Sequence, residues 1–537
     1  MNGQDPGSRV SMRPSRSAVI SLVVLALLLG GVTSLVLRAT AGHLTYALDD
    51  AYIHMAIARH VAFDGVWGVS PDHFASASSS PLWTLLLALA FRIAGVHDVV
   101  PLILNLASAV TLAIVLARIL DADGFSVAES AVTAVGILLF APIASMVWIG
   151  MEHSLNNVFV VLAAAAASEL SRPVPRVRPL TLLCFTVLAC ATRLEGTFVA
   201  AGCALLLVTA GRVRLAAACL ATAALPVVAN GLWNLTHGWY FLPASVLMKS
   251  AATGSPTSAS GFLQQWLAST PPAELLALAG AATLLLARRL WLSRAIGPDG
   301  LLVVFLVAAV LHTALARFGY LYRYESYLMV LGVLAVATAA HHAADGIARA
   351  VRIVGPGEVV TVLMLVATAA GSARTLASNG VLATTAGHIH RQQQQMALFV
   401  ARYYDSGAVA LNDIGAVSYG SHARIFDLAG LASLDVTRAR RAGRFDAAFI
   451  NRWLDAGEVP LAIIYDDWFT GTQRFADRWT RVARWVTDQP PHEVESAVTF
   501  YARTRADAAR LRDQLREFQP ALTSDVTVEW ADPLAVP

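Results

Sequence analysis

Residues 17–37 read SAVISLVVLALLLGGVTSLVL, and shortly afterwards residues 48–60 read LDDAYIHMAIARH. The first stretch is apolar and long enough to cross a bilayer as a helix, which needs roughly 20 such residues. The second places two adjacent carboxylates, Asp49 and Asp50, just beyond that helix. Aspartates are common at helix starts, where they accept hydrogen bonds from unpaired N–H groups. They are also candidates for catalysis, and this stretch alone leaves both interpretations open.

The composition extends this membrane character to the whole chain. Of the 537 residues, 56% are hydrophobic and only 14% are charged, whereas a soluble domain carries about 25% charged residues. The formal net charge of +3 is small for the length, and the basic residues are spread through short loops. We therefore expect a mostly α, polytopic membrane protein that contacts membrane lipid and binds no nucleic acid.

Eleven apolar runs could span the membrane, and a shorter one decides the orientation of the chain. The eleven lie near residues 18–38, 99–118, 128–148, 154–169, 178–192, 196–210, 215–233, 274–289, 300–317, 325–345 and 356–371. The shorter run, PLWTLLLALAFRIAG at 81–95, opens with proline. If it does not cross, the later arginine clusters fall on the same side as the N-terminal arginines, as the positive-inside rule requires. We therefore predict about eleven transmembrane helices, a cytoplasmic N-terminus and an outer-face loop over 39–98.

The long apolar runs end at about residue 371, and the following sequence is typical of a soluble domain. From about residue 388, the short β-rich runs AVALNDI, ARIFDL and LAIIYD alternate with helical pieces such as FDAAFINRWLDAG and RADAARLRDQLREFQ. This alternation is typical of an α/β domain of ordinary size. We expect a transmembrane domain over 1–380 and a small extracytoplasmic α/β domain over 388–537. HIHRQQQQ at 388–395 is expected to begin a linking helix rather than a metal site.

The predicted topology gathers ionisable residues from several loops on the outer face. Ionisable groups near a membrane are costly and often face a cavity, so they are functional candidates. Besides Asp49 and Asp50, the candidates are His54, Glu152, Arg193, Glu195, Lys249 and Arg323. Because function often lies on loops held by rigid helices, we expect one polar site assembled from these loops.

Each of these candidates also has a structural interpretation. Arg193 and Glu195 stand two residues apart and could simply pair, and Glu152 could cap the helix that follows it. Lys249 is the only lysine in the chain. We expect Lys249 and Arg323 to bind an anionic group, since lysine is a point charge for phosphate and arginine a planar fork. The alternative is that they extend to lipid headgroups.

The adjacent aspartates suit two kinds of chemistry. A carboxylate can remove the proton from a sugar hydroxyl as that hydroxyl attacks. The same pair could instead hold a divalent cation. The sequence does not separate these uses, and it does not say which of Asp49 and Asp50 would act.

Seven segments, taken in order, match the pattern of a known family. They are DDAY at 49–52, PLWTLLLAL at 81–89, GME at 150–152, TRLEG at 192–196, LPASVLMKS at 242–250, RYESYLMVL at 323–331 and NDIGAVSYGSHARIFDLAGL at 412–431. In this order the chain resembles the integral-membrane glycosyltransferases of the GT-C superfamily. It is most similar to the branch with the cell-wall arabinofuranosyltransferases that use decaprenyl-phospho-arabinofuranose.

The resemblance implies a GT-C-like fold and a transfer reaction. A sugar, arabinofuranose being favoured, would pass with inversion from a polyprenyl-phosphate donor to a cell-envelope glycan or glycolipid on the outer face of a bacterial plasma membrane. Asp49 or Asp50 would be the general base, and Lys249 and Arg323 would contact the donor phosphate. The loop FASASSSPLW at 74–83 departs from the Tyr-Thr-Asn-like stretch of the family, which leaves the sugar and the acceptor open.

Other classes of protein predict different patterns. No G-x-G-x-x-G or P-loop stands between a strand and a helix, so no nucleotide site is expected, and DIGAVSYG at 413–420 is expected to form a turn. A transporter would show internal repeats and polar residues near mid-membrane. A non-catalytic envelope-assembly protein would keep the fold but would not need Asp49 and Asp50. The pattern calls for no cofactor, although a divalent cation stays open.

Overall fold

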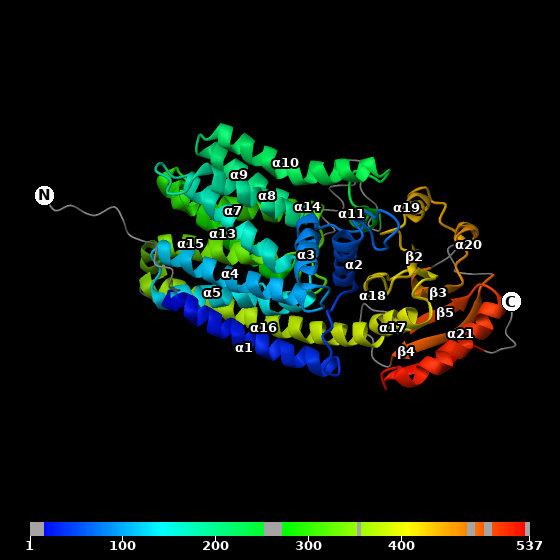
Figure 1. Cartoon of the computed structure of the whole chain (residues 1–537). Coiled ribbons are helices and arrows are strands. Elements are labelled where there is room, and N and C mark those ends of the chain that lie inside the picture. The colour runs from blue at the N-terminus through cyan, green and yellow to red at the C-terminus, as the bar shows by residue number, and fades with distance from the viewer. Residues whose placement is uncertain (1–14, 252–270, 352–355, 470–477, 488–496, 532–537) are drawn as a thin grey trace.

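The computed structural model describes residues 15–251, 271–351, 356–469, 478–487 and 497–531. Within these ranges the chain forms a bundle of apolar helices followed by a smaller α/β unit. Figure 1 shows the long helices side by side, with the sheet beyond one end of the bundle.

Seven helices of the described residues are long and apolar enough to cross a membrane, or eight if one bent pair counts as a single span. The seven are α1 (Arg16–Ala39), α4 (Val100–Ala122), α10 (Val213–Thr236), α13 (Ala273–Ser293), α14 (Gly300–Leu315) with the preceding 3₁₀ turn η1 (Gly297–Asp299), α15 (Ser326–Val351), and α16 (Pro356–Arg391) with its continuation α17 (Gln393–Tyr403). The bent pair is α5 (Val127–Phe140) and α6 (Ile143–Ile149), with a bend of 42°. The protein is therefore a mostly α, multi-span membrane protein.

All eleven predicted runs form helices, although three of them are short or less apolar. These three are α7 (His153–Leu170), α8 (Pro179–Thr192) and α9 (Gly196–Thr209). A 14-residue helix such as α8 or α9 extends about 21 Å at 1.5 Å per residue. The hydrocarbon core is about 30 Å thick, so these two helices do not cross it unaided.

Two short helices lie across the end of the bundle, between it and the α/β unit (Figure 1). They are α2 (Asp49–Phe63) and α3 (Pro81–Ala94). Pro81 occupies the start of α3, where its missing N–H costs no helical hydrogen bond. This is the placement expected of a helix that runs along a membrane surface without crossing.

The α/β unit is built on a six-stranded sheet of order β2-β1-β3-β5-β4-β6. Its strands are β1 (Ala408–Leu411), β2 (Arg424–Asp427), β3 (Leu461–Ile464), β4 (Thr480–Thr487), β5 (Ala497–Ala502) and β6 (Val526–Trp530). β1 pairs in parallel with β2 and β3, and the other neighbours pair antiparallel. The helices of the unit are α18 (Gly415–Gly420), α19 (Leu434–Arg441), α20 (Ala447–Ala456) and α21 (Arg505–Phe518), with 3₁₀ turns η2 (Asp466–Trp468) and η4 (Gln519–Ala521). The runs AVALNDI, ARIFDL and LAIIYD contain β1, β2 and β3, as predicted.

One long helix connects the bundle to the sheet. The apolar run at 356–371 continues as α16 to Arg391, and α17 follows after Gln392. HIHRQQQQ therefore belongs to a helical link, as predicted. The expected domain limits at 380 and 388 both fall within α16, so the division at those residues stays a prediction.

Three apolar cores hold the described part of the molecule together. One fills the bundle and includes Leu112 and Val304. A second extends from α2 and α3 into the sheet and includes Trp83 and Trp485, and a third lies within the α/β unit and includes Leu454. Because this second core is continuous, the segment after the first span is positioned by the α/β unit as much as by the bundle.

Gly202 marks a close contact between α9 and α14. A Cβ at Gly202 would lie 2.8 Å from the Cα and the carbonyl oxygen of Val304, and such backbone contacts are typical of small residues between membrane helices. We expect Gly202→Ala to lower the free energy of unfolding by about 1–3 kcal/mol, because the helices must separate. Thermal unfolding of the purified protein in detergent measures this change.

Gly280 of α13 offers a matched control. A Cβ at Gly280 would meet nothing within 4 Å, so Gly280→Ala should leave the melting temperature unchanged or raise it slightly, since alanine favours a helix. An equal loss of stability in both variants would contradict the close α9–α14 contact.

Candidate functional site

Asp49 begins α2 and binds the start of α18 in the α/β unit. Its Oδ1 accepts the N–H of Ala416 at 2.7 Å, and its Oδ2 accepts the N–H of Gly415. The first N–H groups of a helix have no partner within it, so a carboxylate satisfies them. A Cβ at Gly415 would lie 2.7 Å from Oδ2 of Asp49. Position 415 is therefore a glycine because the carboxylate approaches so closely.

This contact corrects one expectation from the sequence. DIGAVSYG was expected to form a turn, but the structure shows the short helix α18 instead. Gly415, at the start of this helix, allows α18 to approach Asp49, which lies 366 residues away in the chain. Local sequence patterns do not reveal such a contact, because the partner residue is distant in the chain.

The half-buried Asp413 lies against the buried carboxyl of Asp49. Gln393 Nε2 donates to its Oδ2 at 2.8 Å. Burial raises the pKa of Asp49 well above its ordinary value, and the neighbouring Asp413 raises it further, against the two N–H groups that lower it. Burial likewise raises the pKa of Asp413. The Asp49 side chain is buried and both of its oxygens already accept backbone N–H groups, so it is poorly placed to take a proton from a substrate.

Asp50, the next residue, takes a different environment. Its Oδ2 accepts a hydrogen bond from Nη2 of Arg323 at 2.9 Å. The Asp50 side chain is 37% exposed, whereas the Arg323 side chain is only 2% exposed. Of the two adjacent aspartates, Asp50 is therefore the one that a substrate can reach.

A left-handed turn presents Arg323 to Asp50. Gly319, Tyr320, Leu321 and Tyr322 all have positive φ angles, between 46° and 82°. For a residue other than glycine this conformation costs roughly 1–2 kcal/mol. Three such residues in succession persist only where their surroundings fix them.

Glu325 and Arg374 provide that support. Oε2 of the buried Glu325 accepts the N–H of Gly319 at 2.9 Å, and its Oε1 accepts from Nη2 of Arg374 at 2.6 Å. The Arg374 guanidinium also lies over the ring of Tyr322, 4.4 Å from the centroid. The ion pair between Glu325, just before α15, and Arg374 of α16 thus holds the turn in its left-handed conformation.

The guanidinium of Arg323 is held from several sides. It donates to the hydroxyl of Tyr324 at 3.1 Å and lies 4.8 and 4.9 Å from the ring centroids of Tyr320 and Tyr324. Nη1 contacts the sulfur of Met151 at 2.8 Å. These contacts fix the direction of the positive charge towards Asp50.

Arg193 lies between two glutamates. Its Nη1 donates to Oε1 of Glu152 at 2.5 Å, and its Nη2 donates to Oε1 of Glu195 at 2.6 Å. Burial by itself would raise the pKa of Glu195, but Arg193 brings it below the ordinary value. The predicted pairing of Arg193 with Glu195 is present. Glu152 does not cap α7 with its side chain, and its Oε2 is buried without a hydrogen-bond partner among the described residues.

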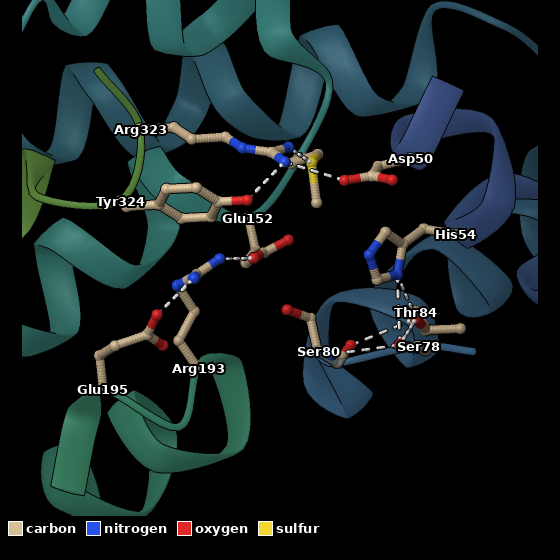
Figure 2. Close-up of polar contacts among 11 residues, drawn as sticks. Asp50, His54, Ser78, Ser80, Thr84, Glu152, Arg193, Glu195, Arg323 and Tyr324 are labelled. Atoms are coloured by element: carbon tan, nitrogen blue, oxygen red, sulfur yellow. Dashed lines mark hydrogen bonds and ion pairs between the residues drawn. The ribbon is translucent and has the colours of Figure 1, made fainter. Parts of the chain in front are cut away.

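His54 follows Asp50 by one helical turn on α2. Its Nδ1 lies 3.0 Å from Oγ1 of Thr84 and 3.2 Å from Oγ of Ser78. Burial lowers the pKa of His54 below its ordinary value, so its imidazole is neutral near pH 7. Figure 2 shows the other ring nitrogen directed towards the space between Asp50 and Glu152.

Figure 2 shows that the side chains of Asp50, His54, Glu152, Arg193 and Arg323 surround one common space. They come from α2, the start of α7, the α8–α9 junction and the segment before α15, and we call them the polar ring. Glu195 contacts this ring through Arg193, whereas Asp49 does not belong to it.

Ser80 joins the ring although the sequence did not single it out. Its hydroxyl points towards the same space (Figure 2) and is buried without a partner in the described part of the chain. The available signal was the serine-rich loop FASASSSPLW, which departs from the family pattern where it borders the site.

The roles of Lys249 and of a divalent cation stay predictions. Lys249 lies in α11 (Ala244–Ala251), but its side chain is outside the described part of the structure. Among the described residues, no three His, Cys, Asp or Glu side chains come together as a set that could hold a metal ion.

A narrow pocket opens next to the polar ring. Ser79 and Pro81 line one side of it, and Leu194, between Arg193 and Glu195, lines another. The other lining residues are mostly apolar: Cys190, Pro226, Val227, Asn230, Phe241, Leu242 and Pro243. The pocket thus lies beside Arg193 and Glu195, and its walls are mainly apolar surfaces of α3, α8 and α10.

Comparison with known proteins gives weak similarities. A family model described as a domain of unknown function, DUF8728, matches residues 386–502, which cover α17 and β1–β5. No curated protein matches the sequence. The chain is similar to ArnT from Cupriavidus metallidurans bound to undecaprenyl phosphate, with 11% identity, a TM-score of 0.49 and coverage of 91% of this chain and 98% of that one.

Two further solved structures show similar values. ArnT in the apo state is 12% identical, with a TM-score of 0.48 and the same coverage of both chains. The arabinofuranosyltransferase AftD from Mycobacteria is 13% identical, with a TM-score of 0.40, and the match covers 92% of this chain but 41% of that one. At these TM-scores the similarities assign no family, so the function is argued from the site itself.

The two adjacent aspartates should respond differently to the same substitution. Asn has one acceptor oxygen, so Asp49→Asn leaves the N–H of Gly415 or Ala416 unpaired and should cost about 1–3 kcal/mol of unfolding free energy. Asp50→Asn keeps an oxygen for Arg323 and should change stability by less than about 1 kcal/mol. Thermal unfolding of both purified variants checks this difference, and a larger loss in Asp50→Asn would contradict the assigned environments.

Stability should also depend on pH through the Asp49–Asp413 pair. An unfolded aspartate titrates near 3.9, and the folded pKa of both groups is raised. Their contribution to stability is therefore fully present below about pH 4 and is lost as the pH rises through the folded values. We expect Asp413→Asn to flatten this decline in melting temperature between pH 4 and 8. The exposed Asp513→Asn is the control and should follow wild type. Curves that stay parallel for wild type and Asp413→Asn would contradict the raised pKa of the pair.

Proposed function

We propose that this chain is an inverting glycosyltransferase of the GT-C type. It moves a sugar, arabinofuranose being favoured, from a polyprenyl-phosphate donor to a cell-envelope glycan or glycolipid on the outer face of a bacterial plasma membrane. The observation that carries the proposal is the accessible carboxylate of Asp50, held opposite the buried cation of Arg323 within the polar ring.

Asp50 is the general base of this reaction. An acceptor hydroxyl attacks the anomeric carbon, its proton passes to the Asp50 carboxylate, and the bond from that carbon to the phosphate oxygen breaks on the opposite face. A base within hydrogen-bond reach of the attacking hydroxyl contributes roughly 10²–10⁴-fold to the rate. Asp49 positions this base by tying the start of α2 to α18.

We assign the departing phosphate to Arg323 once it has released Asp50, because Nη2 contacts the Asp50 carboxylate whereas the phosphate leaves on the face of the sugar opposite the base. The contacts to Tyr324 and Met151 keep the guanidinium beside the site, and a positive charge held there stabilises the negative charge of the phosphate. Lys249 is the second candidate for the phosphate, since lysine binds phosphate as a point charge. No nucleotide site is needed, because the polyprenyl phosphate itself carries the sugar.

The remaining polar atoms of the ring suit a sugar. Oε2 of Glu152 and the hydroxyl of Ser80 are buried without partners among the described residues, and such groups are costly unless a ligand pairs with them. Sugar hydroxyls can donate to Glu152 and exchange hydrogen bonds with Ser80 and the neutral imidazole of His54. Arg193 and Glu195 hold Glu152 in position.

The location of the ring supports a membrane-surface enzyme over a transporter. A transporter site is expected near mid-membrane, whereas the ring contains residues of α2, which lies across the end of the bundle (Figure 1). The apolar surface of α3, α8 and α10 beside the ring suits contact with the lipid chain of the donor. We place the N-terminus in the cytoplasm, the transmembrane domain at 1–380 and the α/β domain at 388–537 outside.

Transfer from radiolabelled decaprenyl-phospho-arabinofuranose tests the proposal, with a polyprenyl-phospho-hexose in parallel. We expect Asp50→Asn to lower the transfer rate by 10²–10⁴-fold, the contribution of a general base, with an unchanged melting temperature. Asp64→Asn is the matched control, because Asp64 ends the same helix but pairs with His60 outside the ring.

Different failures have different meanings. Wild-type rates in Asp50→Asn would remove Asp50 as the base. Transfer of the hexose alone would correct the sugar but leave the mechanism intact, and no transfer of either sugar by wild type would remove the donor class.

A further inference from the structure

A second polar hollow lies in the α/β unit, away from the polar ring. It is formed between α19, the loop that follows it, and α20, and it encloses about 410 Å³. Its lining residues are Asp435, Arg438, Ala439, Arg444, Phe449, Arg452 and Trp453. In Figure 1, α19 lies beside α11 and the end of α10, so the hollow is close to the bundle.

The hollow carries an excess of positive charge. Three arginines line it against the single carboxylate of Asp435. Arg438 donates to the backbone carbonyl of Gly238 at 3.0 Å, and none of the three forms an ion pair within the described ranges. Elsewhere in the same unit arginines do find carboxylates, as Arg402 does with Glu517. Gathered guanidinium groups that form no ion pair repel one another and favour an anion that binds them through paired hydrogen bonds.

Aromatic rings form another wall of this hollow. The rings of Phe449 and Trp453 stack with centroids 6.3 Å apart and planes 14° apart, and Phe426 meets Trp453 edge-on at 5.0 Å. Both Phe449 and Trp453 are only half-buried. An exposed aromatic face offers a flat apolar surface to a ring-shaped ligand that has polar groups at its edge.

The position of α19 is fixed from the bundle side. Besides the bond from Arg438 to Gly238, the guanidinium of Arg441 lies over the ring of Tyr240, 4.9 Å from its centroid. Both partners belong to the segment between α10 and α11. The hollow is thus built on a helix that the membrane part of the chain holds in place, which favours a preformed binding site.

We propose that this hollow binds an anionic saccharide, that is, a sugar carrying a phosphate or carboxylate group. The arginines pair with the anion, and the Phe449–Trp453 face takes the sugar ring. This site is separate from the polar ring and does not rest on the glycosyltransferase reaction proposed above.

Binding of a sugar phosphate to the full-length protein tests the inference. The protein is placed in nanodiscs of phosphatidylcholine, and the dissociation constants of mannose 6-phosphate and of mannose are measured. We expect mannose 6-phosphate to bind at least tenfold more tightly than mannose. Arg444→Gln/Arg452→Gln should weaken its binding at least tenfold, since both charge-assisted pairs are lost.

The control removes the same charge elsewhere in the unit. Arg481 and Arg505 are exposed and do not line the hollow, so Arg481→Gln/Arg505→Gln should bind mannose 6-phosphate as wild type does. The melting temperatures of both double variants show whether each is folded. Equal affinity in wild type and Arg444→Gln/Arg452→Gln would overturn the proposal.

Two further results would overturn it in informative ways. If inorganic phosphate displaces mannose 6-phosphate with the same affinity, the hollow recognises an anion alone and the sugar plays no part. If wild type binds no mannose 6-phosphate but binds phosphatidylglycerol vesicles through Arg444 and Arg452, the occupant is a lipid headgroup. The assay contains no polyprenyl donor, so its outcome is independent of the transfer experiment.

Discussion

The carboxyl of Asp49 accepts the N–H groups of Gly415 and Ala416, and the arrangement of the site depends on this contact. It ties the helix that carries Asp50 and His54 to the α/β unit, at the end of the bundle where α2 and α3 share a core with the sheet. Hydrogen bonds to a charged or partly charged group contribute about 1.5–3 kcal/mol each. Arg59, near the other end of α2, donates to the carbonyls of Ser418, Tyr419 and Ser421, so polar contacts at both ends of α2 fix its direction against α18.

The adjacent aspartates therefore divide two tasks that sequence alone could not separate. Asp49 is enclosed with Asp413, and Asp50 faces Arg323 and solvent. The same division explains the strained segment before α15: the left-handed residues Tyr320–Tyr322 aim a buried cation at Asp50, and the Glu325–Arg374 pair offsets their conformational cost. A rigid cation beside an accessible carboxylate is the feature on which the proposed reaction depends.

Much of this could be predicted from the sequence. Hydropathy located the helices because burial in lipid demands long apolar runs, and the alternation near AVALNDI and LAIIYD located the strands. Loop residues such as Arg193 and Arg323 could be singled out because an ionisable group near a membrane is costly and therefore often has a function. The opposite roles of Asp49 and Asp50, the involvement of Ser80 and the turn at Tyr320–Tyr322 could not be predicted, since each depends on distant partners and on no local glycine or proline signal.

The Asp49–Gly415 contact also has a consequence for biosynthesis. Its two partners lie 366 residues apart in the chain, so Asp49 leaves the ribosome long before Gly415 does. During translation the segment that holds Asp50 therefore lacks its contact with α18 until most of the chain has been inserted. A chain that ended before residue 415 would therefore contain every residue of the polar ring and still lack the segment that orders it.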